Sequence, residues 1–241
     1  MVAMDRVTTG IDGLDELLEG GFPKGSVVLV SGSPGAGKTI FGLQFLKKGV
    51  DIGERGLYLT FEETRPFILE QAHRFNWDLE LAESEHKLRL VSLVVSHTSI
   101  EKVLAEIEEL VKKFQPNRLV LDSLTMLQVY TNVLVDAKSV EMLGVSDKSY
   151  EAVTRKAIAD IVERLRGYGA TSLVTSELQE GSQWYSRDTV SEFICDGVIK
   201  LSKIETIGKR MLTIGKMRST RHDVLPKPIN IGEDGIILVK G

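Results

Sequence analysis

Eight residues near the start of the chain constrain its fold more than any other feature. Residues 32–39 read Gly-Ser-Pro-Gly-Ala-Gly-Lys-Thr and match the pattern G-x-x-x-x-G-K-[ST]. A β-branched apolar run at 27–30 precedes this motif, and a segment with helical spacing at 40–48 follows it. A glycine-rich turn between a strand and a helix lets successive backbone N–H groups point at one anion. The sequence therefore predicts a phosphate-binding loop, and with it an α/β fold.

The residue types in this loop are those that bind a nucleoside triphosphate. The Lys38 ammonium would neutralise the β- and γ-phosphates, and the Thr39 hydroxyl would ligate Mg²⁺. A glycine-rich turn with a purely structural role would not need this Lys-Thr pair. We therefore predict a nucleotide-binding set made of Gly32, Ser33, Pro34, Gly35, Ala36, Gly37, Lys38, Thr39 and Ile40.

Three carboxylates that follow apolar strands are candidates for the chemistry. Asp122 ends the run Arg-Leu-Val-Leu-Asp, and a carboxylate at such a strand end commonly holds the metal of a phosphate site. We therefore predict Thr39 and Asp122 as the Mg²⁺ ligands. Glu62 and Glu63 follow the strand-like run at 57–61, and repulsion between adjacent carboxylates raises the pKa of one toward that of a useful base. The alternative for this pair is two solvated loop glutamates.

Strand-like runs alternate with segments of helical spacing, as in an α/β domain with a mostly parallel sheet flanked by helices. One helix is predicted between 99 and 114, with Thr98 and Glu101 as a capping box, and another from about 148 to 166. The clearest strands are predicted at 27–31, 56–61, 88–93, 118–122 and 171–175.

After Gly197 the pattern changes to short strands separated by turns. These strands are predicted at 197–204, 210–217, 229–231 and 236–239, which indicates an antiparallel extension at the C-terminal end of the sheet. No repeat, low-complexity tract or Pro/Ser-rich linker interrupts the chain, so we predict a single domain over residues 1–241.

Composition excludes several other classes of protein. No window approaches the roughly 18 consecutive apolar residues that a membrane span requires, and the N-terminus lacks the features of a signal peptide. We therefore expect a cytoplasmic protein with no membrane partner. The one cysteine, Cys195, cannot form an intrachain disulfide or a cysteine-based zinc site. The net charge of −4 provides no overall field that would attract nucleic acid.

The charge is unevenly distributed along the chain. The stretch 200–227 holds eight basic residues against Glu205 and Asp223, a balance of +6, which leaves −10 for the rest of the chain. A solvated face of a strand-rich segment and a basic edge that meets a phosphate both fit this pattern. The basic residues are Lys200, Lys203, Lys209, Arg210, Lys216, Arg218, Arg221 and Lys227.

Four motifs, taken in order, resemble those of KaiC-type domains in the RecA superfamily. They are the run at 9–26, the Ser-Pro-Gly-Ala-Gly-Lys-Thr form of the loop at 33–39, Phe61-Glu62-Glu63, and Lys216-Met217-Arg218. The resemblance extends over about residues 5–240, almost the whole chain. KaiC itself carries two such domains in tandem, whereas this chain has the length for one.

The resemblance implies a RecA-like P-loop ATPase core that assembles into a homo-oligomeric ring, expected to be a hexamer, with ATP and Mg²⁺ between neighbouring subunits. It implies that Glu62 is the catalytic carboxylate, with Glu63 as its neighbour or substitute. It also implies that Lys216 and Arg218 reach the γ-phosphate held by the adjacent subunit, as an arginine finger does. On this interpretation the basic stretch is an edge presented to a neighbour's phosphates.

A histidine near the nucleotide is the remaining residue that the resemblance assigns. His222 is the matching position, and it completes the predicted nucleotide-binding set. The family's usual pattern here is Lys-Met-Arg-Gly-Ser-x-His, and this chain departs from it at Ser219 and Arg221.

A recombinase paralogue that binds single-stranded DNA is one alternative. Its DNA would contact the loops at 129–148 and 179–189, but neither loop is net basic. Trp184 and Tyr185 would stack on bases in that case, whereas sheet-edge or subunit packing is the other role for them. The length leaves no room for the additional DNA-binding module of archaeal recombinases.

Two further alternatives are that the protein uses ATP to phosphorylate itself, or that it binds ATP without hydrolysing it. Residues 186–191 occupy the stretch in which the second domain of KaiC phosphorylates its own Ser and Thr side chains, although 190–196 is more similar to the unphosphorylated first domain. A scaffold that binds ATP without hydrolysing it, and whose ring is bound by partner proteins, is the other alternative. The presence of Glu62, Asp122, Lys216 and Arg218 argues against such a scaffold.

Overall fold

The computed structural model describes residues 4–93, 100–126, 147–204 and 208–239. Within these residues a nine-stranded sheet has the order β11-β10-β9-β8-β3-β7-β6-β4-β5. Its parallel part comprises β3 (Val27–Gly32), β4 (Gly56–Thr60), β5 (Leu88–Ser92), β6 (Arg118–Asp122), β7 (Thr171–Glu177) and β8 (Gly197–Ile204). The antiparallel extension comprises β9 (Lys209–Met217), β10 (Lys227–Gly232) and β11 (Gly235–Leu238). The predicted α/β fold and its C-terminal antiparallel extension are confirmed.

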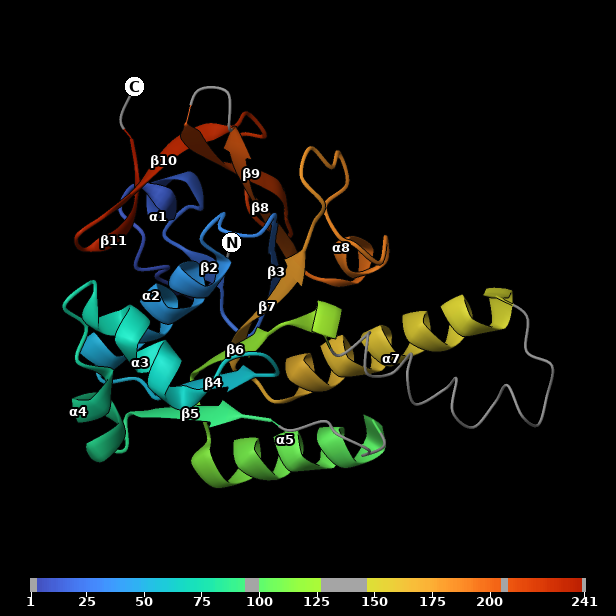
Figure 1. Cartoon of the computed structure of the whole chain (residues 1–241), viewed down its shortest axis with the longest axis horizontal. Helices are drawn as coiled ribbons and strands as arrows, with labels where there is room; N and C mark the ends of the chain where they lie inside the picture. The colour runs from blue at the N-terminus through green and yellow to red at the C-terminus, as the bar shows by residue number, and fades with distance from the viewer. Residues whose placement is uncertain (1–3, 94–99, 127–146, 205–207, 240–241) are drawn as a thin grey trace.

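Helices cover both faces of this sheet (Figure 1). One face carries α1 (Leu14–Leu17), α2 (Lys38–Asp51), α3 (Arg65–His73) and α4 (Leu79–Ser84), and the other carries α5 (Ile100–Phe114) and α7 (Asp147–Gly167). The short helix α8 (Ser191–Ile194) precedes β8, and β1 (Arg6–Val7) pairs with β2 (Phe22–Pro23) in a separate two-stranded sheet. In the parts of the chain that the structure describes, no helix combines the length and the apolar character needed to cross a bilayer.

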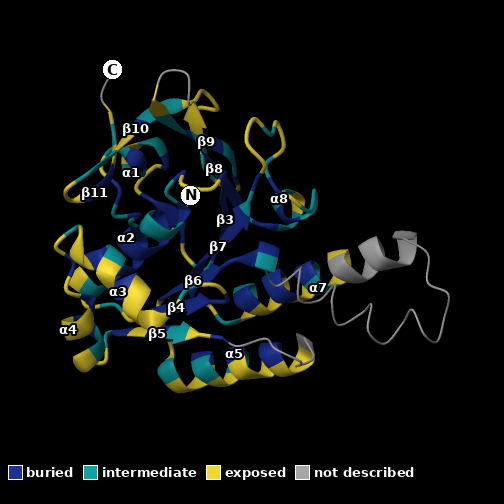
Figure 2. Cartoon of the chain, in the orientation of Figure 1, coloured by how far each residue is buried: buried dark blue, intermediate teal, exposed yellow. Residues whose placement is uncertain are grey.

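The strand sequences explain why both faces are covered. Along β3, Val28 and Val30 belong to the core under α2, whereas Val27 and Leu29 belong to the core under α5 and α7. Successive side chains of a strand point to opposite faces, so a strand that is apolar at every position needs a helical layer on each side. Figure 2 shows the resulting buried centre of the sheet.

The element boundaries differ from the sequence predictions by a few residues. Strand β7 continues to Glu177, beyond the predicted end at Thr175, and α2 begins at Lys38 rather than at Ile40. The N-cap of α2 is Gly37 with φ of 108°, a left-handed conformation that glycine adopts without a steric penalty. Residues 94–99, which include the predicted cap at Thr98, lie outside the described residues.

The register of the sheet determines which side chains can meet. In the parallel pairing of β3 with β8, Gly32 is opposite Leu201 and Val28 is opposite Gly197. The antiparallel pairing of β8 with β9 then places Met217 opposite Gly197. The C-terminal end of β9 therefore lies at the amino edge of the parallel strands, while the phosphate-binding loop leaves β3 at their carboxyl edge.

A buried arginine joins the start of β6 to the N-terminal segment, to α2 and to the turn after α2. Arg118 is 0% exposed, its Nε donates to Glu54, and its Nη1 donates to the carbonyls of Thr8 and Phe45 at 2.7 and 2.8 Å. Its guanidinium carbon also lies 4.6 Å from the centroid of the Phe45 ring. Because a buried cation needs a compensating charge, Glu54 is the side chain on which this arrangement depends.

We expect Glu54→Ala to lower the free energy of unfolding by about 2–3 kcal/mol, because it leaves the buried Arg118 charge without its carboxylate. Urea unfolding without nucleotide measures the change. The matched control is Glu85→Ala, since Glu85 pairs with Lys87 at the surface and such pairs contribute little. Equal stability of the two variants would contradict the role of Glu54.

Candidate functional site

A cleft of about 650 Å³ opens at the carboxyl edge of the sheet, within the size range of ligand pockets. Side chains that follow β3, β4, β6 and β7 converge on it, together with residues from the end of α3 and from β9 and β10. The lining residues are Pro34, Gly35, Gly37, Lys38, Thr39, Ile40, Glu62, Glu63, Gln71, Arg74, Phe75, Asp122, Glu177, Arg210 and Ile231. Six of the ten residues predicted to bind nucleotide line this cleft. Of the other four, Gly32, Ser33 and Ala36 lie in the buried base of the loop, and His222 lies outside the cleft.

The loop at 32–39 has the conformation expected of a phosphate cradle. Gly35 and Gly37 both have positive φ angles, 74° and 108°, so the chain curls before α2 begins. Lys38 is buried, and its ammonium donates to the carbonyls of Gly32 and Ser33 at 3.0 and 3.2 Å. The unpaired N–H groups and the dipole at the N-terminus of α2 therefore face the same space as the Lys38 charge.

Asp122 is held at the base of the cleft by three hydroxyl groups. The Thr39 hydroxyl donates to Asp122 Oδ2 at 3.2 Å, the Tyr58 hydroxyl donates to the same oxygen at 2.6 Å, and the Thr175 hydroxyl donates to Oδ1. Burial, followed by the charge of Asp122, raises the pKa of Tyr58 well above its ordinary value, so Tyr58 remains a proton donor. Adjacent hydroxyl and carboxylate oxygens are the ligand types that Mg²⁺ prefers, and Thr39 and Asp122 provide them beside the phosphate loop.

The two glutamates after β4 are held differently. Ser123 Oγ donates to Glu62 Oε1 at 2.9 Å, whereas Gln71 Nε2 donates to both carboxylate oxygens of Glu63 at 3.1 and 3.0 Å. The Thr60 hydroxyl accepts from both backbone N–H groups and orients the turn that carries them. Burial raises the pKa of both carboxyls, and the charge of Asp122 adds to the effect. Glu62 is therefore the carboxylate that accepts fewer side-chain hydrogen bonds, one against two for Glu63.

Glu177 is a cleft residue that the sequence analysis did not identify. It ends β7, the strand beside β3, and its carboxylate lies 3.7 Å from the Lys38 ammonium. Its only local signal is its place two positions after the predicted end of this strand, and a surface glutamate at a strand end has the same signal. The sequence also did not indicate that Gln71 and Arg210 line this cleft, because α3 and β9 approach the loop only in the folded chain. Arg210 Nε donates to the carbonyl of Gly35 at 3.4 Å.

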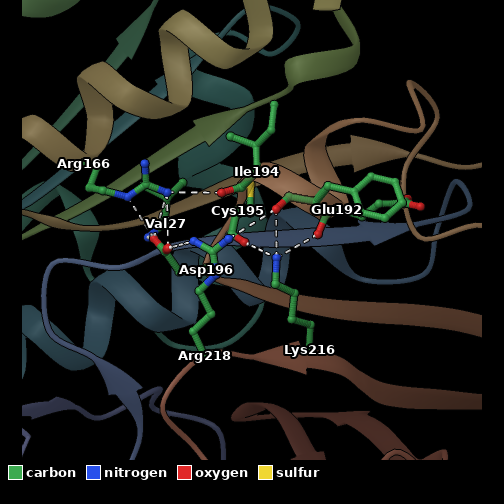
Figure 3. Close-up of polar contacts among 9 residues, drawn as sticks. Val27, Arg166, Glu192, Ile194, Cys195, Asp196, Lys216 and Arg218 are labelled. Atoms are coloured by element: carbon green, nitrogen blue, oxygen red, sulfur yellow. Dashed lines mark hydrogen bonds and ion pairs between the residues drawn. The ribbon is translucent and has the colours of Figure 1, made fainter.

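Lys216, Arg218 and His222 are not brought to the cleft of their own chain. The Lys216 ammonium donates to the carbonyls of Glu192, Phe193 and Cys195, at 3.1, 3.0 and 2.7 Å, at the amino edge of the sheet (Figure 3). Arg218 Nη1 donates to an oxygen of Asp196 at 2.8 Å in the same place.

The ring Nδ1 of His222 lies 3.1 Å from the carbonyl oxygen of Thr220, and His222 does not line the cleft. The basic residues of the stretch 200–227 therefore do not all lie on one face of the protein. Arg210 reaches the phosphate loop, while Lys216 and Arg218 lie at the opposite end of the same strand, because β9 crosses the full height of the sheet.

Of the segments proposed for DNA binding and autophosphorylation, those at 179–189 and 186–191 are fully described. The loop at 129–148 lies outside the described residues except for its last two. In the loop at 179–189, Trp184 is 63% exposed, whereas the Tyr185 ring packs on the backbone of Gly215. The hydroxyls of Ser186 and Ser191 are buried and donate to Glu192 and Asp188, so they are not presented at the surface.

A P-loop follows β3 at the edge of a mostly parallel sheet, and the carboxylate of Asp122 ends β6, which is separated from β3 by β7 alone. This arrangement defines a P-loop NTPase of the RecA type. The family model of the KaiC ATPase matches residues 7–241, and the chain therefore belongs to the KaiC family of ATPase domains.

Relatives agree with this assignment. A UPF0273 protein of Pyrococcus furiosus is 31% identical over 97% of this chain and 93% of its own length. The circadian clock oscillator protein KaiC of Synechococcus elongatus is 32% identical over 97% of this chain, which spans only 44% of that protein. A KaiC-like protein of the hyperthermophilic archaeon Pyrococcus horikoshii OT3 has a crystal structure with a TM-score of 0.82 and 33% identity, over 99% of this chain and 100% of the other.

We expect Glu177→Gln to tighten the binding of a non-hydrolysable ATP analogue with Mg²⁺ about two- to fivefold, because the variant removes a negative charge that faces Lys38 and the phosphates. Isothermal titration calorimetry measures the dissociation constant. Glu180→Gln is the matched control, since Glu180 is exposed and outside the cleft. Weaker binding by Glu177→Gln would show instead that this carboxylate supports the site.

Proposed function

We propose that this protein hydrolyses ATP in a Mg²⁺-dependent reaction at the interfaces of a homo-oligomeric ring, as a regulatory or signalling ATPase. The observation that carries the proposal is the convergence of Lys38, Thr39, Asp122 and Glu62 in one cleft at the carboxyl edge of the sheet. These residues supply a phosphate cradle, a pair of metal ligands and a carboxylate base, which are the parts that phosphoryl transfer to water requires.

The phosphates of ATP would lie on the loop at 32–39 and the N-terminus of α2. Their arrival would give the Lys38 ammonium a new set of acceptors in place of the carbonyls of Gly32 and Ser33. Thr39 and Asp122 would hold Mg²⁺, which neutralises charge on the β- and γ-phosphates when bound. The hydrogen bonds from Tyr58 and Thr175 keep the Asp122 carboxylate oriented for that role.

Glu62 is the residue that we assign to the attacking water. Ser123 holds one of its oxygens, and its raised pKa makes it a stronger base than an ordinary glutamate. Glu63 is held by Gln71 through both oxygens, so a supporting role fits it better.

The positions of the remaining cations support the proposed ring. Lys216 is opposite Val198, whereas Gly32 is opposite Leu201, a displacement of about 10 Å along β8 away from the loop. Lys216 and Arg218 therefore serve the cleft of a neighbour rather than their own. A head-to-tail contact of this kind joins two different surfaces and closes into a ring when its rotation permits. A positive charge delivered in this way stabilises the transition state only in the assembled protein.

We expect Glu62→Gln to lower kcat about 100-fold or more, because the general base is lost, while Glu63→Gln causes a much smaller loss. Steady-state phosphate release measures both. A larger effect at Glu63 would transfer the role of base to that residue.

The pH profile provides a second measure of the same assignment. Only the ionised carboxylate can accept a proton, and the pKa of Glu62 is raised, so activity should fall on acidification at a higher pH than for an ordinary glutamate. The residual activity of Glu62→Gln should lack this acidic decline. An unchanged profile in the variant would contradict Glu62 as the titrating base.

We expect Arg218→Ala to lower the ATPase rate about 1,000-fold or more, as the loss of an arginine finger does. Light scattering with and without Mg²⁺ and ATP reports assembly in parallel. Arg221→Ala is the matched control, since Arg221 is exposed and three positions away on the same segment. If Arg218→Ala changes neither assembly nor rate, the action of Arg218 on a neighbour is wrong.

A further inference from the structure

A single carboxylate, Asp196, lies among the cations at the amino edge of the sheet. Its Oδ1 accepts from Arg218 Nη1 at 2.8 Å and from Arg166 Nη2 at 3.2 Å, and its Oδ2 accepts from the backbone N–H of Val27 at 3.0 Å. Lys216 lies beside it on the carbonyls that precede β8 (Figure 3). We call Asp196, Arg166, Lys216 and Arg218 the Asp196 cluster. Nothing in the proposed reaction so far uses Asp196 or Arg166.

The backbone of Asp196 is fixed on both sides. Its N–H donates to the Val27 carbonyl at 2.8 Å, and its own carbonyl accepts from the N–H of Arg218 at 2.9 Å. Asp196 and Arg218 are therefore joined twice, once through the backbone and once through their side chains. The side chain of Asp196 is 15% exposed, while that of Arg218 is 52% exposed, so the arginine extends outward from a buried anchor.

The charges of the cluster allow Asp196 to hold Arg218 without cancelling its charge. Burial acts to raise the pKa of Asp196, but the hydrogen bond from Val27 and the Arg166 and Arg218 guanidiniums outweigh it and lower the pKa. The carboxylate is therefore ionised at neutral pH. Three cations surround this one carboxylate, and the cluster keeps a net positive charge at the edge.

Arg166 has a separate part in the arrangement. It comes from the last turn of α7 and also donates to the carbonyl of Ile194 at 3.1 Å, which ties α7 to the end of α8. Because Arg166 balances the charge of Asp196, the charge of Arg218 remains available for an anion outside the chain. A free arginine side chain loses rotamer entropy when it binds an anion, so holding it in place before the anion arrives favours the interaction.

We propose that Asp196 is a positioning residue, which holds Arg218 at the amino edge in the orientation that reaches the ATP of the neighbouring subunit. This inference rests on the proposed function, because Arg218 must act in the neighbour's site. It adds a residue that acts through Arg218 rather than touching ATP. It also predicts that the defect of an Asp196 variant appears in the site of the next subunit and not in its own.

The experiment compares ATPase rates of Asp196→Asn alone and in mixed rings with Lys38→Ala. In Asp196→Asn the amide oxygen can still accept from Val27, but the charge that holds Arg218 is lost. We expect kcat to fall at least tenfold with little change in KM, because the variant's own cleft is intact. Asp196→Ser, whose hydroxyl can also accept from Val27, should give the same loss if the first variant folds poorly, and thermal unfolding checks both.

Mixed rings are made by co-expressing two differently tagged variants and purifying through both tags. Each variant alone is expected to have at most a tenth of the wild-type rate, since one lacks the Lys38 ammonium and the other lacks a positioned Arg218. In a mixed ring, an Asp196→Asn subunit can be served by the intact Arg218 of a Lys38→Ala neighbour. We expect recovery to about a quarter of the wild-type rate, the share of such interfaces in a random equimolar ring.

The control is Asp223→Asn, which removes a carboxylate paired with Lys227 in the same basic stretch and should retain the wild-type rate. A normal rate in Asp196→Asn, with a large loss in Arg218→Ala, would overturn the positioning role and leave the proposed function standing. Loss without recovery in mixed rings would also overturn it, because the defect would then lie in the variant's own cleft through Val27 and β3. Absence of ATP hydrolysis by the wild-type protein would instead refute the proposed function itself.

Discussion

The parallel pairing of β3 with β7 and β8 is the constraint on which the rest of the structure depends. It places the phosphate loop and Glu177 at one edge of the sheet and the start of β8 at the other. Since β9 then runs antiparallel to β8, its two ends lie at opposite edges. Arg210 therefore contacts the loop of its own chain, while Lys216 and Arg218 cannot. One register thus determines which cations lie beside the chain's own cleft and which lie at the opposite edge of the sheet.

The carboxyl edge of the sheet is rich in carboxylates, whereas the amino edge carries an excess of positive charge. Four carboxylates, Glu62, Glu63, Asp122 and Glu177, lie around one cleft, and burial together with their mutual repulsion raises the pKa of the first two. Such a site stabilises bound cations, and the raised pKa of Glu62 suits it to act as a general base. The amino edge carries the excess of positive charge of the Asp196 cluster. In the proposed assembly, the negative edge of one subunit with its nucleotide meets the positive edge of the next.

Much of the fold and part of the site could be predicted from local patterns. The loop at 32–39, the strand at 118–122 and the helix beginning near 148 are each specified by residues adjacent in sequence, since glycine placement and apolar periodicity act over short distances. Glu177 was missed because nothing local distinguishes a strand-end glutamate from a surface residue. Its function as a partner of Lys38 arises from the pairing of β3 with β7, which joins residues far apart in the chain.

The sequence by itself determined the class of fold, the phosphate loop, the candidate metal ligands Thr39 and Asp122, and the charge imbalance of the C-terminal stretch. Only the tertiary structure decided how those charges are divided between two edges, which glutamate after β4 is held by Gln71, and that Asp196 anchors Arg218. The physical reason is the separation along the chain over which each kind of interaction acts. Backbone preference and periodicity depend on near neighbours, whereas hydrogen bonds and ion pairs depend on side chains that meet only when the sheet has formed.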